Sequence, residues 1–201
     1  MKTREEIIIK LVKNKKVLDL GNSWGDFKGL IKSQASSYKG LDIEKGADYC
    51  YDLNKPFKLK EKFDVIVAGE LIEHIENIGI FLDNIKNVMH KNSYFVLTTP
   101  NPTSFRFIFY GLFGKEPAFG GHIKYFTPDS LRLLLDRYFK IVKIGFCNNT
   151  TNIKGKDSIV WKIKYNIENI IGDVIGRYSP HIYAICKRKW LINLENGFKV
   201  K

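Results

Sequence analysis

The segment from Val17 to Phe27 constrains the fold of this chain more than any other. It reads VLDLGNSWGDF, a short apolar run that leads through an acidic residue into a glycine-bearing turn. A parallel strand buried on both faces is apolar throughout, and the turn after it must let backbone N–H groups approach a ligand. Gly21 and Gly25 permit this approach because they lack a Cβ atom. The segment therefore predicts a buried strand followed by a ligand-binding turn.

A second acidic residue follows at the distance of one strand–helix–strand unit. Asp42 lies 23 residues after Asp19, and residues 27–36 between them suit a crossover helix. At the end of the second strand, the Asp42 carboxylate can accept both hydroxyls of a ribose beside the first turn. The spacing indicates a ligand that contains adenosine.

Later segments indicate which adenosine-containing ligand the chain binds. Residues 51–57 read YDLNKPF, and residues 63–75 read FDVIVAGELIEHI, a strand that runs into a helix. Together with Asp42 and the first turn, they resemble class I S-adenosylmethionine-dependent methyltransferases.

Two further segments resemble the small-molecule branch of that family, and the likeness covers nearly the whole chain. They are YFVLTTPNP at 94–102 and HIKYFTP at 122–128, where Thr127 can cap a helix and Pro128 suits its first turn. The nearest relatives would be ubiquinone-pathway and natural-product O-methyltransferases.

The resemblance implies one methyltransferase domain over residues 1–201 with an α/β architecture. This is a Rossmann-like, seven-stranded, mostly parallel sheet with helices on both faces and an antiparallel last strand. The strands are expected at 16–20, 38–43, 47–51, 63–68, 93–99, 140–147 and 181–188.

The resemblance also implies which residues bind the cofactor, S-adenosylmethionine. The first loop would hold the methionine portion, the second acidic residue the ribose, and the 52–53 pair the adenine, while one glutamate would line the site after the fourth strand. These residues are Asp19, Gly21, Ser23, Gly25, Asp42, Asp52, Leu53 and Glu70.

Ser23 departs from the family, whose first loop usually carries glycine at this position. Serine has a Cβ atom and a hydroxyl, so either the loop avoids positive φ there or the hydroxyl contacts the amino-acid portion of the ligand. A degenerate site is the remaining interpretation. It makes a cofactor-binding protein without transfer activity the alternative outside enzymes.

Two histidines are the candidate catalytic residues. Methyl transfer mainly requires in-line alignment and, for a hydroxyl acceptor, removal of a proton. His74 or His122 would serve as the general base. We therefore expect a methyltransferase that acts on a small-molecule acceptor, at a hydroxyl oxygen.

A divalent metal is an alternative that we do not favour. Glu70, Glu73 and His74 lie on one side of a helical turn, and His122 would add a fourth ligand. This spacing resembles the metal motif of small-RNA 2′-O-methyltransferases and of some quinone-ring methylating enzymes, although many relatives carry Glu-His here without metal. The alternative activity within enzymes is accordingly 2′-O or base methylation of RNA.

The net charge of +12 bears on possible partners. A basic surface attracts phosphate, but the lysines are scattered and form tight clusters only at 13–16 and 187–189, without interleaved aromatic residues. A generally basic solvated surface is therefore the simpler interpretation, and nucleic acid is not favoured. Contact with a membrane surface stays open, and the sequence does not indicate an oligomeric state.

Two segments look like additions to the core fold. The insertion at 103–121 is rich in aromatic residues, which suit a lid over an apolar or ring-shaped acceptor, contact with a membrane surface, or a short packing helix. The segment 156–178 repeats isoleucine and valine at helical spacing. We expect this amphipathic helix to pack its apolar stripe on its own core, and a dimer contact or a membrane surface is the alternative role of the stripe.

The first residues predict a helix rather than a signal peptide, because Thr3 and Glu6 form a capping-box pattern. With no apolar run of roughly 20 residues, a cytoplasmic protein is expected. The three cysteines, Cys50, Cys147 and Cys186, are expected to be core thiols without chemistry.

Overall fold

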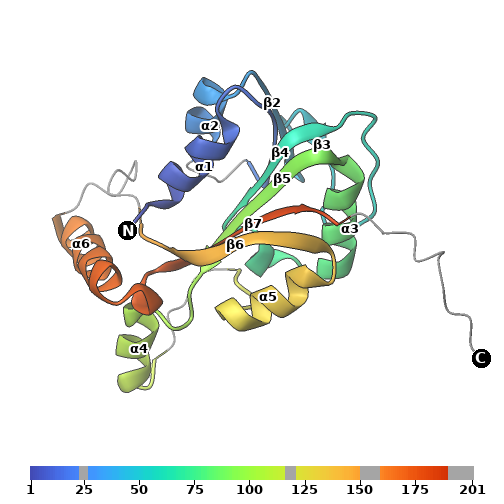
Figure 1. The fold of residues 1–201 in the computed structure, drawn as a ribbon. Helices are drawn as coiled ribbons and strands as arrows, with labels where there is room; N and C mark the ends of the chain where they lie inside the picture. Colours follow the sequence, from blue (N-terminus) through green and yellow to red (C-terminus); the bar gives the residue numbers. More distant parts are fainter. Residues whose placement is uncertain (23–26, 116–120, 150–158, 190–201) are drawn as a thin grey trace, which may run out of the picture.

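A seven-stranded sheet forms the centre of the computed structural model, which describes residues 1–22, 27–115, 121–149 and 159–189 (Figure 1). The strand order is β3-β2-β1-β4-β5-β7-β6, and β7 runs antiparallel to both of its neighbours while the β3-β2-β1-β4-β5 pairs are parallel. The strands are β1 Lys16–Leu20, β2 Ser37–Asp42, β3 Tyr49–Cys50, β4 Phe63–Gly69, β5 Met89–Pro100, β6 Phe139–Cys147 and β7 His181–Arg188. The expected architecture and its antiparallel last strand are confirmed.

Helices cover both faces of this sheet (Figure 1). The helices are α1 Arg4–Val12, α2 Lys28–Gln34, α3 Ile78–Val88, α4 Phe105–Leu112, α5 Pro128–Asp136 and α6 Ile159–Val174, with short 3-10 helices η1 Ile72–His74 and η2 Gly176–Tyr178. Helices α3 and α5 pack into one hydrophobic core and α1 and α2 into a second core on the other face, as the α/β architecture requires.

The central strands are apolar on both faces because each face contacts a different core. In β4, Ile66 and Ala68 pack into the core under α3 and α5, whereas Val65 and Val67 face α1 and α2. Burial on both sides explains why this strand has no alternation of polar and apolar residues. Polar side chains that serve a ligand must then lie at the strand ends.

The predicted helix starts are confirmed. The Thr3 side chain accepts a hydrogen bond from the Glu6 N–H, and the Glu6 side chain accepts one from the Thr3 N–H, which completes a capping box. Thr127 makes the equivalent pair with Ser130 at the start of α5, where Pro128 occupies the first turn.

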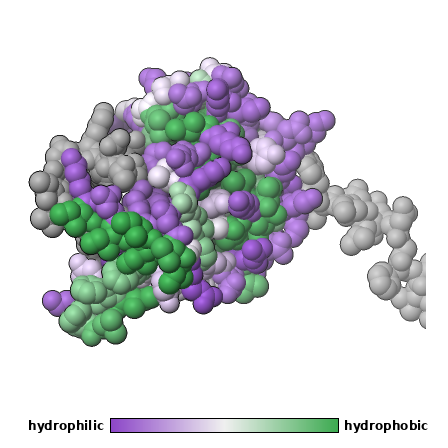
Figure 2. Space-filling model, turned by 60° about the vertical axis from the view of Figure 1, so that its left-hand side comes forward, coloured by the Kyte–Doolittle hydropathy of each residue, from purple (hydrophilic) through white to green (hydrophobic). Residues whose placement is uncertain are grey.

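Three expectations differ from the structure. The third strand spans only two residues instead of 47–51, and its Cys50 is exposed, because β3 is the edge of the sheet. Cys147 and Cys186 are buried as expected. The stripe of α6 is the third case: Ile163, Ile167, Ile170 and Val174 are exposed rather than packed on a core. Figure 2 shows a continuous hydrophobic surface on this side of the molecule, over α4 and α6.

Among the described residues, the helices are all too short or too polar to cross a bilayer.

Candidate active site

The turn after β1 requires glycine at its first position. Gly21 has φ +68°, in the left-handed region, and its N–H donates a hydrogen bond to the Leu41 carbonyl at 2.8 Å. A Cβ atom here would lie 2.8 Å from Leu71 Cδ1. Gly21 therefore joins the ends of β1 and β2 where a side chain would not fit. Ser23 and Gly25 lie outside the described residues.

Asp19 is buried at the end of β1 and held by two side chains that the sequence did not indicate. The Tyr38 hydroxyl donates to Asp19 Oδ2 at 2.9 Å, and Asn22 Nδ2 donates to the Tyr38 oxygen at 3.2 Å. Gly40 makes room for this arrangement, since a Cβ atom there would lie 2.0 Å from Asn22 Nδ2. Only the parallel pairing of β1 and β2 brings Tyr38 beside Asp19.

The two acidic residues of the first strand–helix–strand unit influence each other. Burial raises the pKa of Asp19 to about 7; the Tyr38 hydrogen bond and Lys28 oppose this shift, while Asp42 adds to it. Asp42 is itself buried at the end of β2 and accepts a hydrogen bond from the Glu44 N–H at 3.1 Å. Two neighbouring buried carboxylates suit a ligand that carries a cation and hydroxyl donors.

Asp52 and Leu53 follow β3 and have different surroundings. Asp52 Oδ1 accepts a hydrogen bond from the Asn54 N–H at 2.9 Å, and this contact, with Lys55, lowers the pKa of Asp52. The Leu53 side chain is 7% exposed and packs in the hydrophobic core. Contact of this pair with adenine stays a prediction.

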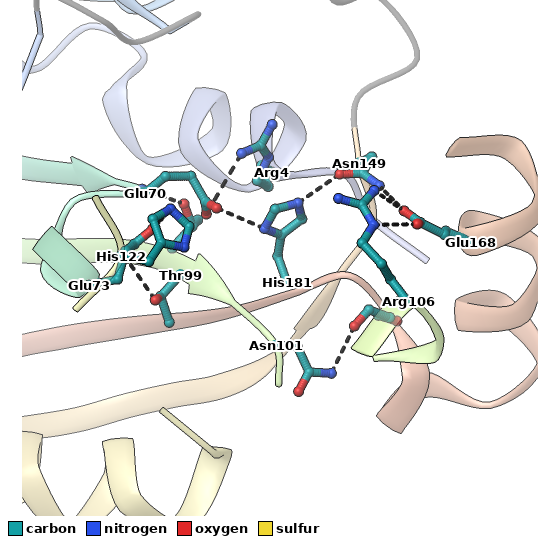
Figure 3. A network of polar contacts seen from close by, with 12 residues as sticks. Arg4, Glu70, Glu73, Thr99, Asn101, Arg106, His122, Asn149, Glu168 and His181 are labelled. Carbon is teal, nitrogen blue, oxygen red and sulfur yellow. Dashed lines mark hydrogen bonds and ion pairs between the residues drawn. The ribbon is translucent and has the colours of Figure 1, made fainter. Parts of the chain in front are cut away.

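Glu70 ends β4 in a conformation that is uncommon for a residue with a side chain. Its φ is +50°, and its N–H donates to the Thr98 carbonyl on β5 at 3.0 Å. The carboxylate lies 3.0 Å from His181 Nδ1 and 3.7 Å from the Arg4 guanidinium (Figure 3). Burial alone would raise the pKa of Glu70, but His181 and Arg4 outweigh burial and lower it to about 2. Glu70 is therefore ionised at neutral pH.

A chain of polar contacts continues from His181 to α4 and α6 (Figure 3). His181 Nε2 lies 2.7 Å from Asn149 Oδ1, and Asn149 Nδ2 donates to Glu168 at 3.1 Å. Glu168 also accepts two hydrogen bonds of 2.6 Å from Arg106. No sequence motif predicts this network, because its members come from elements that are far apart in the sequence. The one signal that could have indicated it is a histidine at the start of β7.

A second cluster, Glu73, His74 and His122, lies beside the network. Glu73 is fully buried, and its Oε2 accepts a hydrogen bond from the Thr99 hydroxyl at 3.0 Å. His122 Nε2 lies 4.0 Å from Glu73 Oε1, and the two histidine rings are 4.7 Å apart edge to face. One ligand atom from each of the three residues lies within 4.8 Å of the others. The structure thus brings together both candidate catalytic histidines, whereas Glu70 turns toward Arg4 and His181.

The electrostatics of this cluster favour a neutral Glu73 and a neutral His122. Burial, and then the neighbouring Glu70, raises the pKa of Glu73 well above its ordinary value. Burial and His74 lower the pKa of His122. His74 Nδ1 lies 2.9 Å from the Gly121 carbonyl, which fixes the orientation of its ring. At neutral pH His122 is therefore unprotonated and able to accept a proton.

A known protein family matches most of the chain. The methyltransferase domain family matches residues 2–143. This chain belongs to that family. The resemblance to class I S-adenosylmethionine-dependent methyltransferases is thereby confirmed.

Individual methyltransferases are similar over shorter or longer stretches. The "Ubiquinone biosynthesis O-methyltransferase" of Pelagibacter ubique (strain HTCC1062) is 28% identical over 115 residues, which are 50% of this chain and 48% of that protein. The chain thus matches about half the length of this curated relative.

Solved structures show the same fold over nearly the whole chain. The superposition with a SAM-dependent methyltransferase from Archaeoglobus fulgidus covers 92% of this chain and 91% of that protein, with a TM-score of 0.61 and 22% sequence identity. The superposition with the N-methyltransferase NodS from Bradyrhizobium japonicum WM9, in complex with S-adenosyl-L-homocysteine, covers 93% of this chain and 86% of that protein. The TM-score is 0.56 and the sequence identity is 13%.

Replacing Asp19 with asparagine should stabilise the ligand-free protein at high pH. The folded-state pKa of Asp19, about 7, lies above its ordinary value of 3.8, so its contribution to stability is complete below pH 3.8 and is lost as pH rises through 7. At pH 8, Asp19→Asn should raise the free energy of unfolding by up to about 4 kcal/mol, and at pH 3.5 the two proteins should be alike. Denaturant unfolding at both pH values measures this difference.

The exposed Asp83 provides the control, because Asp83→Asn should leave the free energy of unfolding unchanged at both pH values. A constant difference between Asp19→Asn and the parent protein across this pH range would contradict the assignment.

Proposed function

We propose that this chain transfers a methyl group from S-adenosylmethionine to a hydroxyl oxygen of a small-molecule acceptor, with His122 as the general base. The observation that supports this most is the cluster of Glu73, His74 and His122, in which Glu73 is buried and partial burial lowers the pKa of His122. Membership of the methyltransferase family and the O-methyltransferase similarity agree with it.

The residues at the ends of β1 and β2 fit the cofactor. When bound, S-adenosylmethionine supplies a methyl group on a positively charged sulfur. Asp42 would accept the ribose hydroxyls, and Asp19 would face the amino-acid portion, whose ammonium group would favour the ionised carboxylate over the protonated one. Gly21 lets the backbone of the first turn approach that portion. Ser23, Gly25, Asp52 and Leu53 stay predicted cofactor contacts.

The proton of the acceptor goes to His122. The bound cofactor would supply its methyl group to the acceptor oxygen and would leave as a neutral thioether that keeps the electron pair of the broken sulfur–methyl bond. His122 accepts the hydroxyl proton because its imidazole is neutral at physiological pH. His74 contacts the His122 ring edge to face and helps to orient it. Glu70, the predicted cofactor contact after β4, is ionised and would offer a negative charge to the sulfonium.

Replacing Asp42 with alanine should weaken cofactor binding. The ribose hydroxyls would lose a charged acceptor, a loss that corresponds to about a tenfold to hundredfold higher dissociation constant. Calorimetric titration with S-adenosylhomocysteine measures this change. The neighbouring exposed carboxylate of Glu44 is the matched control, and Glu44→Ala should bind like the parent. An unchanged dissociation constant in a folded Asp42→Ala protein would rule out the ribose contact.

Replacing His122 with alanine should lower turnover about a hundredfold or more while S-adenosylhomocysteine affinity stays nearly intact. The measurement is methyl transfer to a panel of phenols and catechols. Turnover of the parent should be half-maximal below pH 6.5, because the pKa of His122 is lowered from that value. His90→Asn is the control, since His90 lies at the opposite end of β5 and pairs with Asp64. Loss of cofactor binding in His122→Ala would instead indicate a structural role.

A metal-assisted form of the same reaction is the second candidate. Glu73 Oε1 is buried and accepts no hydrogen bond from the described residues, which is the environment of a carboxylate that binds a cation. Glu73, His74 and His122 would hold the ion, which would lower the pKa of the acceptor hydroxyl.

Chelation separates the two forms. If His122 acts as the base, treatment with EDTA should leave turnover unchanged, and calorimetry should detect no specific binding of Zn²⁺, Mn²⁺ or Mg²⁺. In the metal-assisted form, EDTA should abolish turnover, one of these ions should restore it, and Glu73→Gln should remove ion binding measured without cofactor.

A further inference from the structure

An apolar surface lies on α4 and α6, apart from both hydrophobic cores. Helix α4 reads FRFIFYGL and contains no buried residue, although it is among the most apolar helices of the described chain. Leu112 and Val174 are 77% and 78% exposed. We define the α4–α6 face as Ile108, Phe109, Leu112, Phe113, Ile163, Ile167, Ile170, Val174 and Ile175. Large exposed residues are usually scattered, and a contiguous group of them marks an interaction site (Figure 2).

The two helices form one continuous surface. A groove of about 490 Å³ runs between them and is lined by aromatic residues of α4 and by Ile163 and Ile167 of α6. Arg106 of α4 and Glu168 of α6 also line it, and their two hydrogen bonds of 2.6 Å fix one helix to the other. The folded protein therefore holds the two helices of this face in one fixed arrangement.

The charge of this face favours an anionic partner. Among the residues whose side chains the structure describes, Lys115, Lys162 and Arg177 are exposed and lie on or directly beside these two segments in the sequence. The carboxylates on the described parts of α4 and α6 are already paired: Glu168 binds Arg106, and Asp173 binds the N-terminal amine. The chain as a whole carries +12. A second copy would bring a like charge, whereas an anionic bilayer offers opposite charge beside an apolar interior.

We propose that the α4–α6 face docks on the surface of an anionic lipid bilayer. Its aliphatic and aromatic side chains enter the region between headgroups and acyl chains, while the basic side chains contact lipid phosphates. Helix α4 follows β5, whose end carries Thr99 of the candidate active site. The polar chain from Arg106 to Glu70 also joins this face to the site (Figure 3). Docking would thus turn the acceptor side of the enzyme toward the lipid.

Vesicle flotation tests this proposal with the whole protein. The parent should float with phosphatidylglycerol vesicles and bind phosphatidylcholine vesicles far more weakly, and high salt should reduce its binding. Leu112→Ser/Phe113→Ser/Val174→Ser should weaken binding to phosphatidylglycerol at least about tenfold, because the inserted apolar area is lost. Leu133→Ser/Val142→Ser, which removes exposed apolar residues of α5 and β6, should bind like the parent.

Three outcomes would overturn the proposal. They are equal flotation of the triple variant and the parent, equal binding of the parent to both lipids, and a lipid-independent dimer that the triple variant abolishes. Calorimetry with S-adenosylhomocysteine separates this result from the proposed function, since the triple variant should bind the cofactor product like the parent.

Discussion

The ionised carboxylate of Glu70 connects three elements of this structure at the edge of the candidate active site. It ends β4, contacts Arg4 of α1 and lies against His181 at the start of β7. Burying a carboxylate is costly unless it is paired. This contact therefore adds a charge pair between β4, α1 and β7 to the strand pairing and core packing that already position them, and it lies where the left-handed backbone of Glu70 turns the chain from β4 toward η1. Burial, and then the same charge, raises the pKa of Glu73 three positions later.

The candidate active site uses burial in two opposite ways. At the end of β1, burial raises the pKa of a carboxyl group, Asp19, that a cationic ligand would ionise. Beside β4, burial lowers the pKa of His122, which keeps its imidazole neutral. A parallel sheet covered on both faces produces this contrast, because its polar groups must gather at the strand ends and there share a partly dry environment.

Local patterns were sufficient for much of the fold and part of the site. Capping boxes at Thr3 and Thr127 involve residues three positions apart, so the sequence shows them directly. Gly21 and Asp42 follow from the geometry of one strand–helix–strand unit. No short sequence motif predicts the Tyr38–Asn22 pair or the Arg106–Glu168 pair, because strand pairing and helix packing bring these residues together. The α6 stripe was misjudged because periodicity shows that a helix has an apolar side but not what that side contacts.

The sequence by itself determined the family, the order of strands and helices, and the residues available for cofactor binding and proton transfer, because each depends on short-range spacing and on the polarity of single segments. Tertiary structure alone decided which of those residues meet. Glu70 and Glu73 are three positions apart, yet one carboxylate faces Arg4 and His181 and the other faces Thr99 and His122. It also decided that the apolar side of α6 faces outward beside α4. The reason is physical: burial and charge pairing depend on distances in space that a linear order of residues does not contain.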